Sequence, residues 1–155
     1  LSDASMITLK DNMSRYLANY RMINDYITIT GGQIINVGFE IYAYLDHNFN
    51  RSIVSGEMIN AVRDYMNINN QEMGQNIYLA DLSRTINSID GVLNVTEMKV
   101  FNLVGGQYSI DEVPQPYIDQ TTREINTQNN LTLFGDFNTM FEIKYPENDI
   151  KVIAK

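Results

Sequence analysis

Residues that could carry out chemistry are few in this chain of 155 residues. It contains no cysteine, which excludes disulfides, thiolate metal sites and cysteine nucleophiles. Its single histidine, His47, follows Asp46, and such a pair could act as a general base or supply metal ligands. Zinc sites use three or four ligands, and nothing near His47 offers another strong one. We therefore interpret His47 as a solvated loop residue.

Pairs of carboxylates could support a second kind of chemistry, because glycoside hydrolysis uses two of them at a defined separation. Asp111 and Glu112 lie in a polar stretch, and Glu147 and Asp149 lie in a turn-like one, as is typical of solvated charges. The two Gly-Gly pairs lack the spacing and the lysine of a phosphate-binding loop, and the serines lack a Gly-x-Ser-x-Gly motif. The sequence therefore predicts no catalytic, cofactor-binding or metal-binding residue and no enzymatic activity.

The charge and composition argue against several classes of partner. Eleven basic and nineteen acidic residues give a net charge of −8, which disfavours nucleic acid and anionic membranes as partners. An apolar share of 44% is typical of a globular protein, and no run approaches the roughly 20 apolar residues of a membrane span. We expect no membrane insertion and no small-molecule substrate. The chain begins at Leu1 without a signal-like segment, so we expect it to be a fragment of a longer protein.

A long alternating strand is the clearest structural element that the sequence predicts. Over residues 34–45 the odd positions are Ile, Val, Phe, Ile, Ala and Leu, so one face of the strand is continuously apolar. An apolar sheet face must be buried, and amphipathic helices follow the strand. The sequence therefore predicts an α+β fold in which a small sheet is covered by helices.

The elements around this strand complete the predicted core. An N-terminal helix over residues 6–24 precedes it, because apolar residues there recur at spacings of three and four. Two helices follow, one capped by Ser52 and one over residues 81–88, and a strand returns over residues 92–101. Gly91 is expected to take a left-handed conformation after the second of these helices. The predicted core is thus a strand-helix-helix-strand unit.

The last third of the chain has a different composition. The stretch over residues 104–130 is polar, carries two prolines and shows no sustained period, so we interpret it as an extended linker or arm. Residues 131–155 show short strand patterns separated by a turn. We therefore predict an α+β domain over residues 1–103, an arm over 104–130 and a C-terminal β extension over 131–155.

Several local motifs follow one another in an order that carries a family resemblance. They include GQNIYLADL at residues 74–82 and IDGVLNV at residues 89–95. This ordered set resembles the baseplate-J-like family of contractile injection systems. YLANYRM at residues 16–22 and FEIKYPENDIK at residues 141–151 resemble the C-terminal part of the large baseplate wedge subunit of contractile-tailed bacteriophages. The chain departs from the family at Ala80, where a Ser or Thr usually opens the helix.

The resemblance implies a structural role in the virion. Wedge subunits of this kind join the inner core of each wedge and link neighbouring wedges into a ring around the tail tube, without catalysis. The implied partners are other copies of the chain and other baseplate wedge proteins. The implied location is the virion tail baseplate, assembled in the cytoplasm of the bacterial host.

Apolar residues near the end of the chain are the candidate interface. Aromatic side chains here either complete the core of the domain or bury against another subunit, where aromatics often act as anchors. The family resemblance favours the second interpretation. The alternative function is a receptor-binding or adhesin-like virion domain, which an exposed aromatic pocket on a stable monomer would favour. The candidate interface residues are Phe134, Phe137, Phe141, Tyr145 and Ile150.

Overall fold

A computed structural model describes residues 3–114, 117–127 and 132–155 of the chain. The chain divides into two compact units, Leu1–Gly31 and Gly32–Lys155, which we call unit 1 and unit 2. The predicted domain boundaries at residues 103 and 130 do not coincide with this division, and residue 130 lies outside the described residues. The two units are described separately below.

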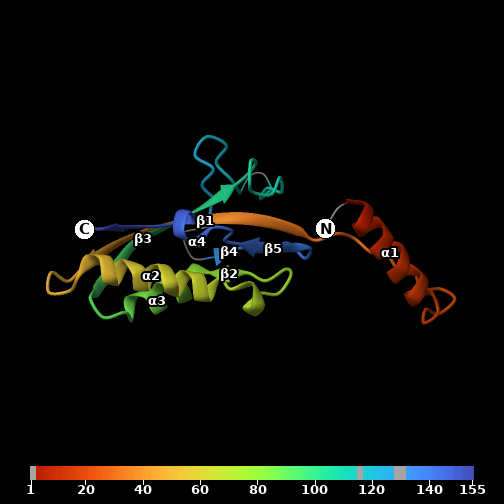
Figure 1. Cartoon of the computed structure of the whole chain (residues 1–155), viewed down its shortest axis with the longest axis horizontal. Helices are drawn as coiled ribbons and strands as arrows, with labels where there is room; N and C mark the ends of the chain where they lie inside the picture. The colour runs from red at the N-terminus through yellow and green to blue at the C-terminus, as the bar shows by residue number, and fades with distance from the viewer. Residues whose placement is uncertain (1–2, 115–116, 128–131) are drawn as a thin grey trace. The chain divides into compact units, whose positions relative to one another are not determined.

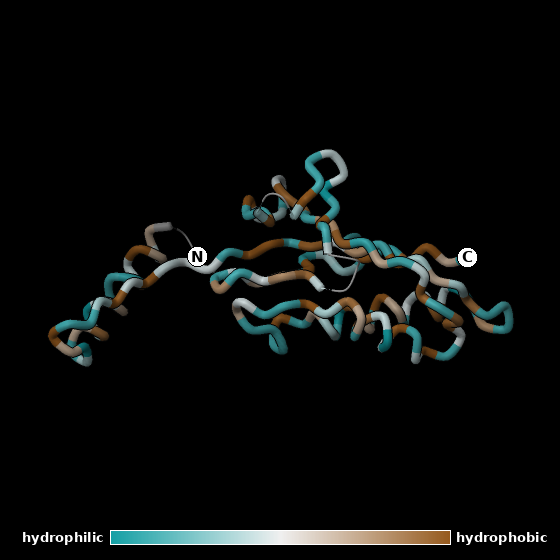
Figure 2. The backbone as a smooth tube through the Cα atoms, turned by 180° about the vertical axis from the view of Figure 1, so that it is seen from behind, coloured by the Kyte–Doolittle hydropathy of each residue, from teal (hydrophilic) through white to brown (hydrophobic). Residues whose placement is uncertain are grey.

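In the described part of unit 1, residues 3–31, the chain forms one helix, α1, which spans Asp3–Ala18. The helix is shorter than the predicted range of 6–24, and the residues after Ala18 form turns and extended backbone. Apolar residues recur along this unit, as the hydropathy colouring in Figure 2 shows. Most of their side chains are exposed.

The long strand β1 (Gln33–Leu45) is the centre of a mixed four-stranded sheet in unit 2. β3 (Val92–Leu103) pairs with one side of β1 in antiparallel orientation. β5 (Thr139–Glu142) and β6 (Ile150–Ala154) both pair with the other side in parallel orientation. This mixed sheet, together with the helices, agrees with the predicted α+β class.

Two helices cover one face of this sheet, as Figure 1 shows. They are α2 (Arg51–Tyr65) and α3 (Leu79–Asn87), separated by the short elements η1 (Ile68–Asn70) and β2 (Ile77–Tyr78). The odd positions of β1 from residue 35 to residue 45 are all buried, which confirms the predicted apolar face. The predicted cap Ser52 is wrong by two residues, because the side chain of Asn50 accepts the hydrogen bond from the Ser52 N–H at 3.0 Å.

The segment predicted to be a free arm is bonded to the sheet instead. Asn36 on β1 and Asn102 on β3 are each only 1% exposed. The Asn36 Oδ1 accepts from the Ser109 N–H at 2.7 Å, and the Asn102 Oδ1 accepts from the Val113 N–H at 2.9 Å. Buried amides need such partners, so these contacts fix the course of the segment. Figures 1 and 2 show most of the segment on the side of β1 away from α2 and α3.

The C-terminal segment is part of the sheet and not a separate extension. β4 (Thr132–Leu133) pairs with β2, and β5 and β6 form one outer edge beside β1. Between them, residues 143–149 lie opposite only Val37 and Gly38, and they leave the sheet to form the short helix α4 (Pro146–Asp149). The C-terminal strands lie in the sheet because β1 has a second side, with which β5 and β6 pair in the described part of the chain.

Gly91 takes the left-handed conformation that the sequence predicts, with φ of +91°. A Cβ at this position would lie 2.7 Å from the Cγ of Phe49 and 2.9 Å from a methyl group of Val54. We expect Gly91→Ala to lower the free energy of unfolding by about 2–4 kcal/mol, because it combines a left-handed backbone with a steric overlap. Urea melts would measure the change.

The matched control for this substitution is Gly56→Ala in α2. A Cβ at Gly56 meets no atom within 4 Å. Alanine is the better helix former, so this change is expected to stabilise unit 2 by about 0.5–1 kcal/mol. If Gly91→Ala and Gly56→Ala changed the free energy of unfolding equally, the left-handed backbone and the steric overlap at Gly91 would not explain the loss of stability.

Candidate interaction surface

The residues singled out for possible chemistry do not converge in the structure. His47 is exposed, and Asp46 beside it accepts hydrogen bonds from the N–H and the side chain of Asn48, both at 2.9 Å. Asp46 therefore stabilises its own turn and is not positioned to activate His47. Within the described ranges, no group of three or more His, Asp or Glu side chains could hold a metal ion.

Of the four carboxylates that the sequence predicted to be solvated, the two aspartates instead hold loops in place, whereas the two glutamates are exposed as predicted. Asp149 is 5% exposed, and its two carboxylate oxygens accept from the Tyr108 hydroxyl at 2.6 Å and from the Tyr145 N–H at 2.8 Å. The hydrogen bond to Asp149 favours the neutral phenol and raises the pKa of Tyr108 to about 12. Asp111 accepts from the Ile34 N–H at 3.1 Å. Asp111 and Asp149 therefore hold backbone segments in place. Their partners are distant in the sequence or have no recognisable pattern, so the sequence did not predict these hydrogen bonds.

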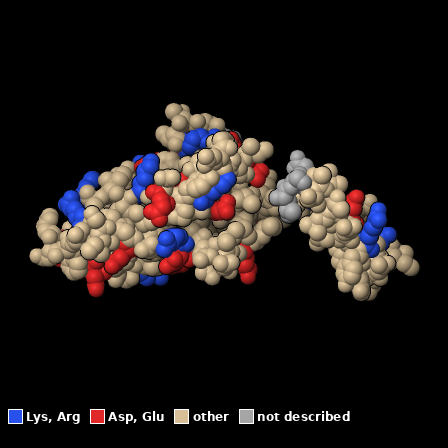
Figure 3. Space-filling view, viewed as in Figure 1, with Lys and Arg blue, Asp and Glu red and all other residues tan. Residues whose placement is uncertain are grey.

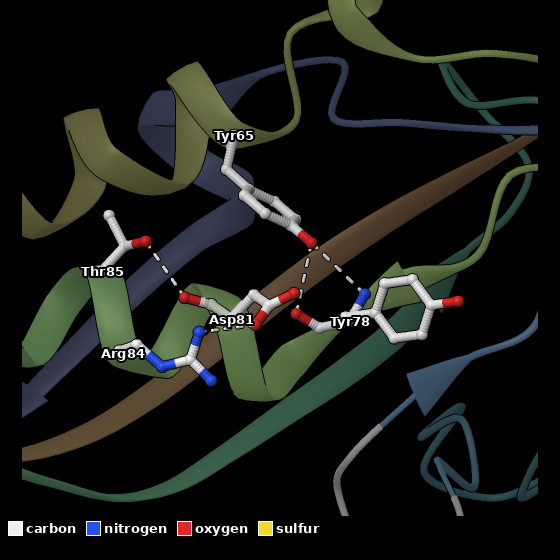
Figure 4. A network of polar contacts seen from close by, with 5 residues as sticks. All are labelled: Tyr65, Tyr78, Asp81, Arg84 and Thr85. Atoms are coloured by element: carbon white, nitrogen blue, oxygen red, sulfur yellow. Dashed lines mark hydrogen bonds and ion pairs between the residues drawn. The ribbon is translucent and has the colours of Figure 1, made fainter.

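A second polar cluster joins α2 to the start of α3, as Figure 4 shows. The Tyr65 hydroxyl donates to the Tyr78 carbonyl at 3.2 Å and accepts from the Tyr78 N–H at 3.3 Å. Burial raises the pKa of Tyr65, and no side chain caps α3. Arg84 and Thr85 bond to Asp81 within the helix, at 3.0 Å in each case. The cluster stabilises the helix junction and offers no nucleophile–base pair.

The five predicted interface residues divide into two groups. Phe134 and Phe137 are 54% and 78% exposed, so they are available to a partner. Phe141 and Ile150 are each 3% exposed and belong to the core of unit 2, so their assignment to an interface was wrong. Tyr145 is half-buried against Tyr108, with ring centroids 5.8 Å apart in an edge-to-face arrangement. The pairing of β5 and β6 with β1 turns Phe141 and Ile150 inward.

Two loops hold Phe134 and Phe137 at the surface. The Gly74 N–H donates to the Thr139 carbonyl at 2.8 Å, and the Gly135 N–H donates to the Asn76 side chain at 3.0 Å. The loops approach so closely that a Cβ on Gly135 would lie 2.5 Å from a backbone oxygen of Gln75. The positions of both phenylalanines are therefore fixed by backbone packing.

A mainly apolar pocket of about 370 Å³ opens beside Phe134. Its walls come from β1, from β4 and from the segment that was predicted to be an arm. Pockets of this size and character hold apolar groups. Its apolar lining residues include Ile35, Val113, Pro114, Tyr117, Ile125 and Leu133.

Unit 1 carries a second exposed apolar surface. Ile23 is fully exposed and Tyr26 is 94% exposed, and the apolar positions of α1 are also open to solvent. The sequence predicted the periodic apolar face of this helix but gave no sign that unit 1 leaves it uncovered. We call this set the α1 surface, and its members are Ile7, Leu9, Met13, Tyr16, Tyr20, Met22, Ile23, Tyr26 and Ile27.

On the face of unit 2 that Figure 3 shows, charge does not single out a binding surface. Figure 3 shows basic and acidic side chains interspersed over the visible face of unit 2. Several are paired, such as Lys151 with Glu40 at 3.3 Å and Arg123 with Glu112 at 3.2 Å. No described helix is both long and apolar enough to cross a membrane.

Comparisons with known proteins assign no family to the chain. No family model matches it, and no curated protein matches it.

Proposed function

We propose that this chain is a structural subunit of the baseplate wedge of a contractile-tailed bacteriophage. In this role it links wedge components into a ring around the tail tube and has no catalytic turnover. Its partners are other copies of itself and other wedge proteins, and its location is the virion. The described elements follow one another as β1, α2, η1, β2, α3 and β3, and this order is compatible with the strand-helix-helix-strand core that the sequence pattern predicts.

The observation that carries the proposal is the α1 surface. A helix of 16 residues is marginal by itself in water, and it becomes stable chiefly by burying an apolar face. In α1 that face is exposed, with Tyr16 63% and Leu9 47% accessible. Exposed apolar surfaces of this extent usually mark contacts between proteins. A subunit whose apolar helix face is buried by neighbouring subunits in an assembly would expose that face in the isolated chain.

Phe134 and Phe137 give independent support for assembly. They project from a loop that packs closely against residues 74–76, and a partner that buries side chains presented in this way has less backbone to order. Large aromatic side chains held in this way are typical anchors of protein interfaces.

The pocket beside Phe134 favours a second candidate function, a receptor-binding virion domain. Its apolar lining and half-exposed aromatic rim would suit an apolar group of a host ligand. An isolated, stable monomer that binds a host surface molecule through this pocket would support this candidate over the baseplate subunit.

The proposed function is tested by following the tagged chain in phage-infected cells. We expect the parent chain to cosediment with tail baseplates. We expect the fraction of chain that cosediments to fall at least tenfold in the double variant Met13→Ser, Tyr16→Ser. Burying each of these side chains against a partner contributes about 1.5–3 kcal/mol to association. The fraction of tagged chain in the baseplate peak measures the effect.

The control is Arg15→Ser, which changes an exposed, charged position of the same helix. Urea melts of unit 2 should be unchanged in all variants. A parent chain that stays free of baseplates would refute the proposed function, whereas a double variant that cosediments normally would refute only the role of α1.

A further inference from the structure

The outer edge of the sheet in unit 2 is open along β6. β6 pairs only with β1, and no described strand lies on its other side. Unpaired strand edges present rows of N–H and C=O groups that can bind another strand. The edge along β6 is therefore a candidate binding surface formed by backbone.

The hydrogen bonds to β1 show which groups of β6 point outward. The Lys155 N–H donates to the Ala43 carbonyl at 2.9 Å, and the Leu45 N–H donates to the Lys155 carbonyl at 3.2 Å. In a parallel ladder alternate residues face the partner strand, so residues 151, 153 and 155 face β1. Val152 and Ala154 then direct their N–H and C=O groups outward, and these groups have no partner in the described part of the chain.

Two other stretches of sheet edge are covered by backbone, one at Thr139 of β5 and one at residues 100–102 of β3. On β5, the Thr139 carbonyl accepts from the Gly74 N–H at 2.8 Å. On β3, the Val100 carbonyl accepts from the Ile125 N–H at 2.8 Å, and the Asn102 N–H donates to the Arg123 carbonyl at 2.9 Å. The edge along β6 lacks such a cover. Of the devices that normally protect an edge of this kind, β6 has a short length of five residues and one lysine, but it contains no proline and no described loop covers it.

The side chains of β6 define what an added strand should look like. Val152 and Ala154 pack at the margin of the core and remain partly exposed, so a neighbouring apolar side chain would complete their burial. On the opposite face, Lys155 is exposed, and Lys151 pairs with Glu40 at 3.3 Å while its side chain remains 65% accessible to a further carboxylate. An added strand fits best if it alternates apolar residues with acidic ones.

We propose that the outer edge of β6 binds an extended segment of another protein as a fifth strand of the sheet. The bound segment alternates apolar residues, which extend the core beside Val152 and Ala154, with acidic residues, which face Lys151 and Lys155. The outward N–H and C=O groups of Val152 and Ala154 supply the backbone hydrogen bonds. This inference needs only the open edge, and it does not rest on the assignment to a baseplate.

The test uses the full chain and a synthetic peptide, acetyl-Thr-Val-Glu-Val-Glu-Val-Thr-amide. In the free chain, amide exchange measured by NMR should be fast at Val152 and Ala154 and slow at Ile153. Adding the peptide at about 1 mM should slow exchange and shift the amide signals at Val152 and Ala154. A peptide with Lys in place of Glu should bind roughly twofold to fivefold more weakly, and one with a central Pro should not bind.

Two proline substitutions separate binding from folding. Ala154→Pro removes an outward N–H, so the chain should stay folded and lose the response to the peptide. Ile153→Pro removes an N–H that bonds to β1, so it should destabilise unit 2. Equal destabilisation by the two substitutions would show that the outward and inward residues were assigned wrongly.

Three results would overturn the proposal. The first is slow exchange at Val152 and Ala154 in the free chain at all concentrations, which would mean that the edge is already covered. The second is protection that rises with chain concentration without peptide, which would identify a second copy as the occupant. The third is the absence of any response to the acidic peptide at about 1 mM.

Discussion

Removal of residues 132–155 is expected to abolish cooperative folding of unit 2. These residues supply β5 and β6, which pair with residues 33–36 and 39–43 on one side of β1. They also bury Leu133, Phe141 and Ile150, each at most 3% exposed. Losing three such side chains removes roughly 5–9 kcal/mol, which is comparable with the total stability of a typical domain. The near-complete loss of a cooperative thermal transition, followed by circular dichroism, would show the effect.

The matched control is removal of residues 1–31, which form a separate compact unit. This deletion should leave the thermal transition of unit 2 nearly unchanged. If the chain without residues 132–155 melted cooperatively, the C-terminal strands would be an independent extension after all.

Phe39→Ala is expected to lower the free energy of unfolding by about 3–5 kcal/mol, as for other buried aromatic residues. Phe39 is 1% exposed and lies in the same buried core as Val62 of α2 and Ile86 of α3. The truncated side chain would leave a cavity that the surrounding helices cannot fill. Denaturant melts with an unchanged slope would measure the loss.

Glu40→Ala provides the control on the opposite face of β1. Glu40 is half-buried, and its ion pair with Lys151 is near the surface, so its removal should cost at most about 1 kcal/mol. If both substitutions destabilised the protein equally, the alternation of β1 would not define the core.

Local patterns were sufficient to predict the elements that pack through their own periodicity. The odd positions of β1 are buried as predicted, and the last strand lies at residues 150–154. Gly91 has its expected conformation, because glycine adopts the φ of +91° that the turn after α3 uses without steric strain. These features could be predicted because each depends on the conformation of a few neighbouring residues or on a pattern that repeats along one element.

Long-range pairing explains what the sequence could not predict. The alternation places the even positions of β1 on the face away from the helices, yet Asn36 is buried there, and its amide bonds to Ser109 and Glu142. The candidate interface failed for the same reason. Phe137 and Phe141 are close in sequence and similar in type, and only the pairing of β5 with β1 distinguishes the exposed one from the buried one.

The pairing of β1 with the C-terminal strands also has a consequence for synthesis. Asn36 and its partner Glu142 are separated by 106 positions. At typical rates of translation, β1 leaves the ribosome roughly 5–20 s before the strands that fill its free side. During that interval the nascent chain presents an apolar strand with an unpaired edge, which is the usual substrate of chaperones and the usual origin of aggregation.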